Sequence, residues 1–309
     1  TGVMEMYLDP YAIQDAFTEC GMRNVQVSGI NKFGPSLEEL ENRYVKLNGR
    51  NDLSSFMLGF HAEYTCSREL LESISQMAHK YQAPVFMHNS ETASEVKECV
   101  DRYGVTPTAL FDQLGIFDYG GGGYHCVHMS DDDFAVMKKR DLTAVTNPAS
   151  NLKLASGICP TSRFLKEGIR MAIGTDGPAS NNCLDMFREM FLVTGLAKYR
   201  DQDASSTDAD DVLYMATVNG AKAMGLSDCE TLSVGSKADI IMIDLHMPNM
   251  QPVHNIPKNI VYAGSKQNVK MTMIDGKILY EDGNFHIGVD PEDVYRECEK
   301  ISKRLYQED

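Results

Sequence analysis

The sequence lacks any long apolar run. None of its 309 residues falls in a stretch that approaches the ~20 consecutive apolar residues of a membrane-spanning helix, and no segment reads as a secretory signal peptide. Positive charge is also scarce, because 29 Lys and Arg face 44 Asp and Glu, for a net charge of −15. Such a chain is repelled by nucleic acids and anionic membranes, so we expect neither as a partner.

Cys-x-x-Cys pairs are absent, although the sequence contains 8 cysteines. These cysteines are widely scattered, whereas secreted disulfide scaffolds are short and densely bridged. We therefore expect reduced thiols and a cytoplasmic protein. An initiator methionine is also lacking, and Gly2–Tyr7 (GVMEMY) reads as the inside of a strand. We expect the chain to begin in the middle of a fold.

Short β-rich segments alternate with amphipathic helical segments over residues 1–226. This alternation favours a parallel sheet covered by helices. Seven such units predict an α/β fold, a (β/α)8 TIM-type barrel that lacks its first strand. A doubly wound sheet is the alternative, but it needs a glycine-rich turn after an early strand, and none is present. The expected strands are Gly2–Tyr7, Asn24–Ile30, Phe56–Tyr64, Pro84–His88, Gly122–Met129, Leu142–Thr146 and Arg170–Gly174, with longer helices near Leu184–Tyr199 and Asp208–Met224.

From about Ser227 the pattern changes to short strands separated by turns. Residues 227–285 are predicted to form a small β unit, one half of a composite sandwich, with a hairpin turn at Asp275-Gly276. A charged helix is expected within residues 286–309. The expected elements of this part are strands at Lys237–Leu245, Asn259–Ala263 and Val269–Tyr280, and a helix at Pro291–Tyr306.

Polar side chains follow five consecutive strands of the predicted barrel. In barrels of this kind, reactive groups gather at the carboxyl ends of the strands. Each residue also has an ordinary structural explanation, such as a histidine bonded to the backbone, a helix-capping acid or a turn aspartate. Those explanations would have to hold at five strand ends in succession, which favours one shared site. The residues are His61, His88 with Glu91 beyond it, His125 with His128, Asn147 and Asp176.

The run His125-Cys126-Val127-His128 offers two histidines to this site. In a strand, residues three apart point to opposite faces. We therefore expect only one of the two to serve the site and the other to pack elsewhere.

The ordered set of these segments resembles the amidohydrolase superfamily, in the branch of methylthioadenosine/S-adenosylhomocysteine deaminases, guanine deaminases and triazine chlorohydrolases. The resemblance extends over essentially the whole chain. Its matching segments are HAEYTCS from His61, His88-x-x-Glu91, His125-Cys126-Val127-His128, NPASNLKL from Asn147, GTDGPASNN from Gly174, ATVNGAKAMGL from Ala216 and GSKAD from Gly235.

The resemblance implies a hydrolase that uses a metal to release ammonia from an aminated purine or a related small heterocycle. It makes His88 and Asp176 metal ligands. Glu91, His125 and Asp176 become the catalytic groups. The implied cofactor is one divalent metal, zinc first, with iron or manganese as alternatives. The strand that carries His61 has no lysine to bridge two metals, which fits the mononuclear branch. Relatives are often homo-oligomers, so the resemblance also implies a possible homo-oligomer.

The substrate contacts implied by the resemblance are His61, Glu91, Asn147 and Ser180. In the implied reaction, a divalent metal lowers the pKa of its bound water and Asp176 accepts the proton. His125 positions that water, and Glu91 protonates the departing ammonia.

The sequence departs from the family pattern in its metal ligands. The family uses a His-x-His pair at the end of the first barrel strand, and this chain has no such pair anywhere. Two of four expected ligands are too few for tight zinc binding, so we expect a fragment that is inactive alone. Glu63 also stands where many relatives have proline, and Val25–Ile30 lacks the arginine that holds an adenosylhomocysteine tail.

Two other functions stay open from the sequence. One is hydrolysis of another C–N bond or of a C–Cl bond on a heterocycle. The other is a non-catalytic fragment that keeps the fold and binds ligands or partners without turnover.

Overall fold

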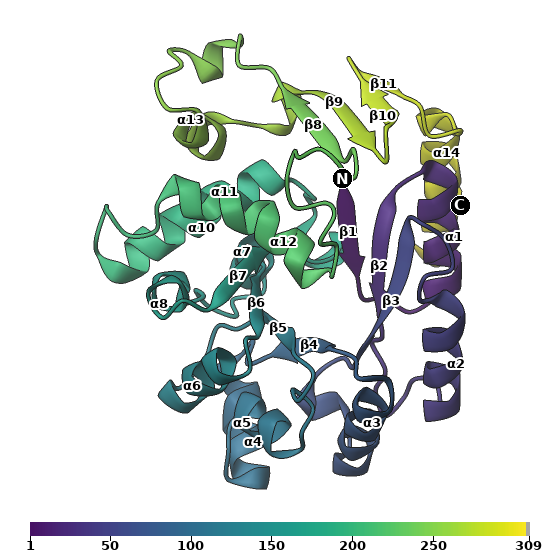
Figure 1. Cartoon of the computed structure of the whole chain (residues 1–309), viewed down its shortest axis with the longest axis vertical. Helices are drawn as coiled ribbons and strands as arrows, with labels where there is room; N and C mark the ends of the chain where they lie inside the picture. Colours follow the sequence, from purple (N-terminus) through teal and green to yellow (C-terminus); the bar gives the residue numbers. More distant parts are fainter. Residues whose placement is uncertain (307–309) are drawn as a thin grey trace.

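Seven parallel strands form the main sheet of the protein in the computed structural model, which describes residues 1–306. The strands lie side by side in the order in which they occur in the sequence, so each strand–helix–strand connection leads to the adjacent strand. Figure 1 shows the sheet curling, with helices on its outside. The strands are β1 (Gly2–Glu5), β2 (Arg23–Val27), β3 (Ser54–Gly59), β4 (Val85–Asn89), β5 (Gly121–His125), β6 (Thr143–Thr146) and β7 (Arg170–Ile173).

This sequential order confirms the TIM-type barrel architecture, to which the described residues contribute seven strands, and excludes the doubly wound alternative, whose strand order reverses at a switch point. The helices outside and after the sheet are α1 (Pro10–Cys20), α2 (Leu37–Leu47), α3 (Arg68–Tyr81), α4 (Ala93–Tyr103), α5 (Pro107–Gln113), α6 (Asp131–Lys139), α7 (Pro148–Lys153), α8 (Thr161–Lys166), α9 (Pro178–Asn181), α10 (Met186–Asp201), α11 (Ala209–Ala216) and α12 (Val218–Ala223), with the 3-10 turn η1 (Glu63–Thr65).

Two clusters of buried side chains hold the barrel together. The larger packs between the sheet and its outer helices, and includes Phe56, Leu71 and Phe111. The smaller gathers side chains of alternate strands, including Val27 of β2, Phe86 of β4 and Val145 of β6, with Ala223 of α12. Side chains alternate between the two faces of a strand, so one set fills the inside of the curl and the other meets the helices.

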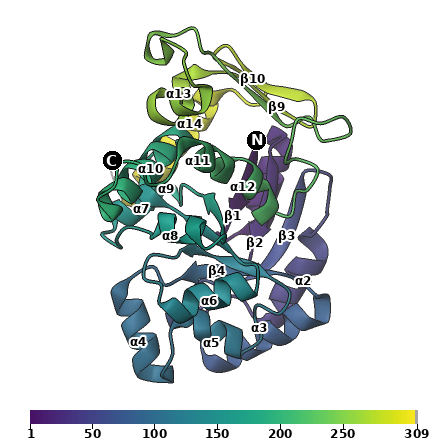
Figure 2. The same ribbon diagram turned by 60° about the vertical axis from the view of Figure 1, so that its left-hand side comes forward.

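A second, antiparallel sheet lies at one end of the barrel, beside the N-terminal strand in both views (Figures 1 and 2). The predicted hairpin at Asp275-Gly276 is confirmed, because β9 and β10 pair across it. The domain boundaries at 226 and 285 stay a prediction. The elements of this part are β8 (Ile240–Ile243), η2 (Pro248–Met250), α13 (Ile256–Ala263), η3 (Lys266–Asn268), β9 (Val269–Ile274), β10 (Lys277–Glu281), β11 (Asn284–Phe285) and α14 (Pro291–Tyr306).

The expected strand Asn259–Ala263 was wrong, because these residues belong to helix α13. Asn255 caps that helix by accepting a hydrogen bond from Lys258 N at 3.0 Å, and a proline stands in the first turn. Both features are helix-start signals. The buried pair Ile260 and Val261 suits a strand or a helix equally well, so the short apolar run alone cannot distinguish the two.

Other expected boundaries also differ, and the three largest differences are these. The helix expected at Asp208–Met224 is two helices, α11 and α12, broken at Thr217, whose ψ is −89°. The third strand ends at Gly59 and not at Tyr64, and the fifth ends at His125 and not at Met129. Within residues 1–306, no helix combines the length and the apolar character needed to cross a membrane.

Candidate active site

Three of the predicted histidines lie in a row along the ends of β3, β4 and β5. The ring centroids of His61 and His88 are 4.8 Å apart, and those of His88 and His125 are 5.4 Å apart. His61 Nδ1 lies 3.1 Å from Thr65 Oγ1 in the turn after β3. The sheet therefore brings together side chains that are 64 positions apart in the sequence.

His88 holds its imidazole in a fixed orientation. Its Nδ1 lies 2.7 Å from the carbonyl oxygen of His61, which accepts a hydrogen bond from the Nδ1–H group and leaves Nε2 with a free lone pair. Burial first, and then the neighbouring His125 and His61, lower the pKa of His88 to about 3. Histidines bind metals as neutral imidazoles, commonly with the other ring nitrogen donating a hydrogen bond to a carbonyl oxygen.

Glu91 reaches the same place from the turn after β4. One of its carboxylate oxygens lies 3.7 Å from His125 Nε2, and the other accepts a hydrogen bond from Ser156 Oγ at 2.8 Å. His128 lies elsewhere, with its Nε2 2.7 Å from the carbonyl oxygen of Ser156. Of the two histidines after β5, only His125 faces Glu91.

Two sharp turns aim these side chains. Ser90 and His125 both adopt the left-handed backbone conformation, with φ of 52° and 70°, which is uncommon for residues other than glycine. The buried carboxylate of Glu95 stabilises the first turn by accepting hydrogen bonds from the amides of Ser90, Glu91 and Thr92 at 3.1, 2.7 and 3.4 Å. The backbone at Glu91 is thus fixed by a side chain of the following helix, α4.

Asp176 follows β7 and is held by its own loop. Its carboxylate accepts hydrogen bonds from Ser150 Oγ and from the amide of Gly177, both at 2.6 Å. Burial alone would raise the pKa of Asp176, but these two donors, with Ser180, bring it below its ordinary value. The carboxylate is therefore ionised at neutral pH and can accept a proton or bind a cation.

Asn147 and Ser180 flank the Asp176 loop. The side chain of Asn147 is buried and lies across Gly174, where an added Cβ would sit 2.3 Å from Asn147 Oδ1. This close approach explains the glycine at the end of β7. Ser180 donates to the carbonyl oxygen of Gly177 at 3.2 Å.

Glu189 of α10 ties the two neighbouring loops together, although it is fully buried. One carboxylate oxygen accepts a hydrogen bond from the backbone amide of Ala149 at 3.0 Å, and the other accepts one from Asn181 Nδ2 at 2.9 Å. Asn181 also donates to the carbonyl oxygen of Thr175 at 2.6 Å. Helix α7, which carries Ser150, and the loop that carries Asp176 are thus joined by one carboxylate.

His88 and Asp176 suit a divalent metal by the chemistry of their donor atoms. A neutral imidazole and a carboxylate, each oriented by a further hydrogen bond, are ordinary zinc ligands. Their number is small: residues 1–306 contain no group of three or more His, Cys, Asp or Glu side chains placed to hold a metal. These two side chains are fewer than the four ligands of an ordinary zinc site.

The comparison with known families decides the family of the chain. The model described as the amidohydrolase family matches residues 31–279, which is most of the chain. The chain belongs to the amidohydrolase family. This makes it a hydrolase of a metal-dependent family, with the TIM-type barrel that the strand order already shows.

Similar proteins carry deaminase names. This amidohydrolase is 38% identical over 313 residues to a 5-methylthioadenosine/S-adenosylhomocysteine deaminase of Caldanaerobacter subterraneus, covering 99% of this chain and 72% of that protein. It is 36% identical to a 5'-deoxyadenosine deaminase of Methanothermobacter thermautotrophicus, covering 93% and 69%. A crystal structure of an adenosine deaminase of Xanthomonas campestris with bound zinc matches with a TM-score of 0.93 and 30% identity, covering 99% and 72%.

The sequence assigned no role to several residues that support the site in the structure. Ser150 and Asn151 lie in a loop that the sequence singled out, but only as part of a matching segment. Ser156, Glu95 and Glu189 were missed. A signal existed for Glu95, since Thr92-x-x-Glu95 is a capping-box pattern. Nothing in the sequence points to Ser156 or Glu189, because both act across the fold.

Proposed function

We propose that this amidohydrolase is a hydrolytic deaminase of an amino-substituted purine, such as an adenosine derivative, and that its chemistry takes place between Glu91, His125 and Asp176. The observation that carries the proposal is the position of the Glu91 carboxylate, 3.7 Å from His125 Nε2 and beside the imidazole row. The deaminase names of relatives up to 38% identical support the substrate class.

His88 and Asp176 would hold a divalent metal, with zinc as the first candidate. When bound, such an ion lowers the pKa of a water molecule so that it can attack an electron-poor ring carbon. Asp176, ionised and oriented by Ser150 and Gly177, accepts the proton of the attacking water. His125 faces the same space with Nε2 and orients the attacking oxygen.

Glu91 carries the other half of the proton transfer. Its carboxylate is oriented by Ser156 and by the turn that Glu95 holds. In protonated form it donates to the departing amine, which leaves as ammonia, a general-acid step worth about 10² to 10⁴ in rate. His61, Asn147 and Ser180 lie around these groups, and we assign them to contacts with the purine and its substituents.

Ammonia release tests the proposal. Because the chain offers two metal ligands, the assay uses the chain alone and the chain joined at Thr1 to a segment carrying the family's His-x-His strand, both loaded with zinc. We expect the joined protein to release ammonia from an adenosine derivative, and the chain alone to be far slower. Chloride release from a chlorotriazine without ammonia from any purine would overturn the proposal. Release of neither by folded, zinc-loaded protein would also overturn the proposal.

A further inference from the structure

His125 is buried against a single polar partner on its Nδ1 side. That nitrogen lies 2.7 Å from Asn151 Oδ1, and both side chains are 1% exposed. The amide nitrogen of Asn151 has no hydrogen-bond partner within residues 1–306. A buried amide with one satisfied end and one free end is rare in folded proteins, so its orientation needs an explanation.

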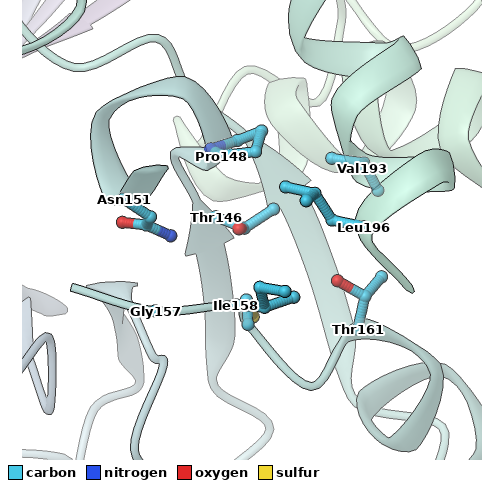
Figure 3. A pocket seen from close by; sticks show the side chains of 9 residues that line it. Thr146, Pro148, Asn151, Gly157, Ile158, Thr161, Val193 and Leu196 are labelled. Atoms are coloured by element: carbon cyan, nitrogen blue, oxygen red, sulfur yellow. The ribbon is translucent and has the colours of Figure 1, made fainter. Parts of the chain in front are cut away.

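The free end of Asn151 faces a small cavity. The cavity has a volume of about 10 Å³ and is lined by Thr146, Thr161 and Ile158 among others. Figure 3 shows the Asn151 side chain at its edge, with the amide nitrogen turned toward it. A single buried water molecule requires about 10 to 15 Å³ and two or more polar partners. One water is thus the group that fits beside this nitrogen.

The two possible amide orientations have different consequences for His125. With Oδ1 toward the ring, Asn151 accepts a hydrogen bond from the Nδ1–H group, and Nε2 keeps a free lone pair. With the amide reversed, the proton must sit on Nε2. The nearest carboxylate oxygen, on Glu91, is 3.7 Å from Nε2, beyond hydrogen-bond distance. The N–H on Nε2 would then lack an acceptor within hydrogen-bond distance, which costs about 1 to 3 kcal/mol. In the present orientation the donor without a protein partner in the described part of the chain is Asn151 Nδ2, which faces the cavity and can bond a water there.

We propose that Asn151 is a positioning residue that fixes His125 as the tautomer protonated on Nδ1, so that Nε2 faces Glu91 as a hydrogen-bond acceptor. Within residues 1–306, no hydrogen bond joins Asn151 to Glu91 or Asp176, so it acts through the imidazole ring. Its neighbour Ser150 orients Asp176. The short helix α7 therefore positions groups of two different barrel strands with two adjacent side chains.

The consequence for turnover rests on the proposed function, whereas the tautomer itself does not. A ring with an unprotonated Nε2 can accept a hydrogen bond from a water or a substrate held between it and Glu91. The reversed tautomer would present a donor there instead. The choice made by Asn151 thus sets the direction of hydrogen bonding at the centre of the site.

Nitrogen-15 NMR of histidine-labelled protein tests the proposal directly. Two-bond proton–nitrogen correlations distinguish the two tautomers, and the His125 signals are assigned by their loss in His125→Gln. We expect Nδ1 to be protonated in the wild type and in Asn151→Asp, which keeps an acceptor at this place. In Asn151→Leu we expect a mixture of tautomers.

A matched control is Asn268→Leu, which removes another fully buried asparagine, in the small β unit. It should cost stability and leave the His125 signals unchanged. A wild-type ring protonated on Nε2 would overturn the proposal, as would a folded Asn151→Leu protein with the wild-type tautomer. Neither outcome depends on substrate, so a failed ammonia assay leaves this measurement decisive on its own. In active protein, Asn151→Leu should lower kcat more than it raises KM, and Asn151→Asp should restore part of kcat.

Discussion

Arg23 and Asp239 form a buried, two-pronged ion pair between the barrel and the small β unit. Nε and Nη2 of Arg23 donate to the two carboxylate oxygens of Asp239 at 2.6 and 2.9 Å. Both side chains are almost fully buried, and the residues are 216 positions apart. The pair joins strand β2 to the segment before β8.

Removal of one partner of this pair should destabilise the protein strongly. Arg23→Met leaves the carboxylate of Asp239 buried without a counter-charge, for which we expect a loss of about 3 to 5 kcal/mol in the free energy of unfolding. Arg50→Met is the matched control, because Arg50 pairs with Asp15 on the surface with both side chains about half exposed. It should cost under about 1 kcal/mol. Urea unfolding measures both, and equal losses would contradict the account.

The same pair should make stability depend on pH. Burial alone would raise the pKa of Asp239, but Arg23 and the amide of Asp275 bring it below its ordinary value. The folded state therefore binds this proton less tightly than the unfolded chain does. The contribution is present above the ordinary pKa of about 4 and is lost as the pH falls through the lowered value.

The difference in unfolding free energy between wild type and Arg23→Met should thus shrink as the pH falls below about 4. Urea titrations at intervals from pH 7 down to pH 3 provide this comparison. A difference that stays constant over the whole range would show that the charge of Asp239 is not what the pair stabilises.

Glu189 should be required for the loops around Asp176. Glu189→Leu leaves the backbone amide of Ala149 without its acceptor, at a cost of about 1 to 3 kcal/mol. It also removes one of the two acceptors of Asn181 Nδ2, which keeps only the carbonyl oxygen of Thr175. Hydrogen exchange should become faster in residues 148–151 and 175–182, while the amides of β2 and β3 keep their protection. Glu297→Gln on the exposed helix α14 serves as control. Unchanged exchange in both loops would refute the bracing role.

Gly122 should be irreplaceable in β5, because a Cβ there would lie 2.2 Å from the carbonyl oxygen of Thr143 in β6. Gly122→Ala must push the two strands apart, and we expect a loss of several kcal/mol of unfolding free energy. Gly195→Ala in the middle of α10 meets nothing within 4 Å and should stabilise by about 0.5 to 1 kcal/mol. Thermal unfolding compares the two; a tolerated Gly122→Ala would mean that β5 and β6 can separate.

The barrel was predictable because its evidence is local and repeated. Strand and helix periodicities alternate along residues 1–226, and polar residues such as His88 and Asp176 stand at the ends of the strands. Parallel strand ends meet at one edge, so sequence order alone placed these residues together. The helix at Ile256–Ala263 was not predicted, because Ile260 and Val261 can be buried equally well in a strand. The helix-capping residue Asn255 is the local signal that distinguishes the two.

The supporting contacts of the site were not predictable for a different reason. Glu189 reaches Ala149 across 40 positions and Ser156 reaches Glu91 across 65, and no spacing rule connects such pairs. The left-handed turn at His125 was also not predicted, because the run His125-Cys126-Val127-His128 reads as the continuation of a strand. The cytoplasmic location and an oligomeric state stay predictions.

Ammonia release by site variants tests the central claim most directly. In the joined, zinc-loaded protein described above, Glu91→Gln and Asp176→Asn should each lower kcat/KM for an adenosine derivative by at least about 10²-fold. Glu98→Gln, an exposed acid on α4, should leave it unchanged. Wild-type rates in either Glu91→Gln or Asp176→Asn would contradict the assignment of proton transfer to these two carboxylates.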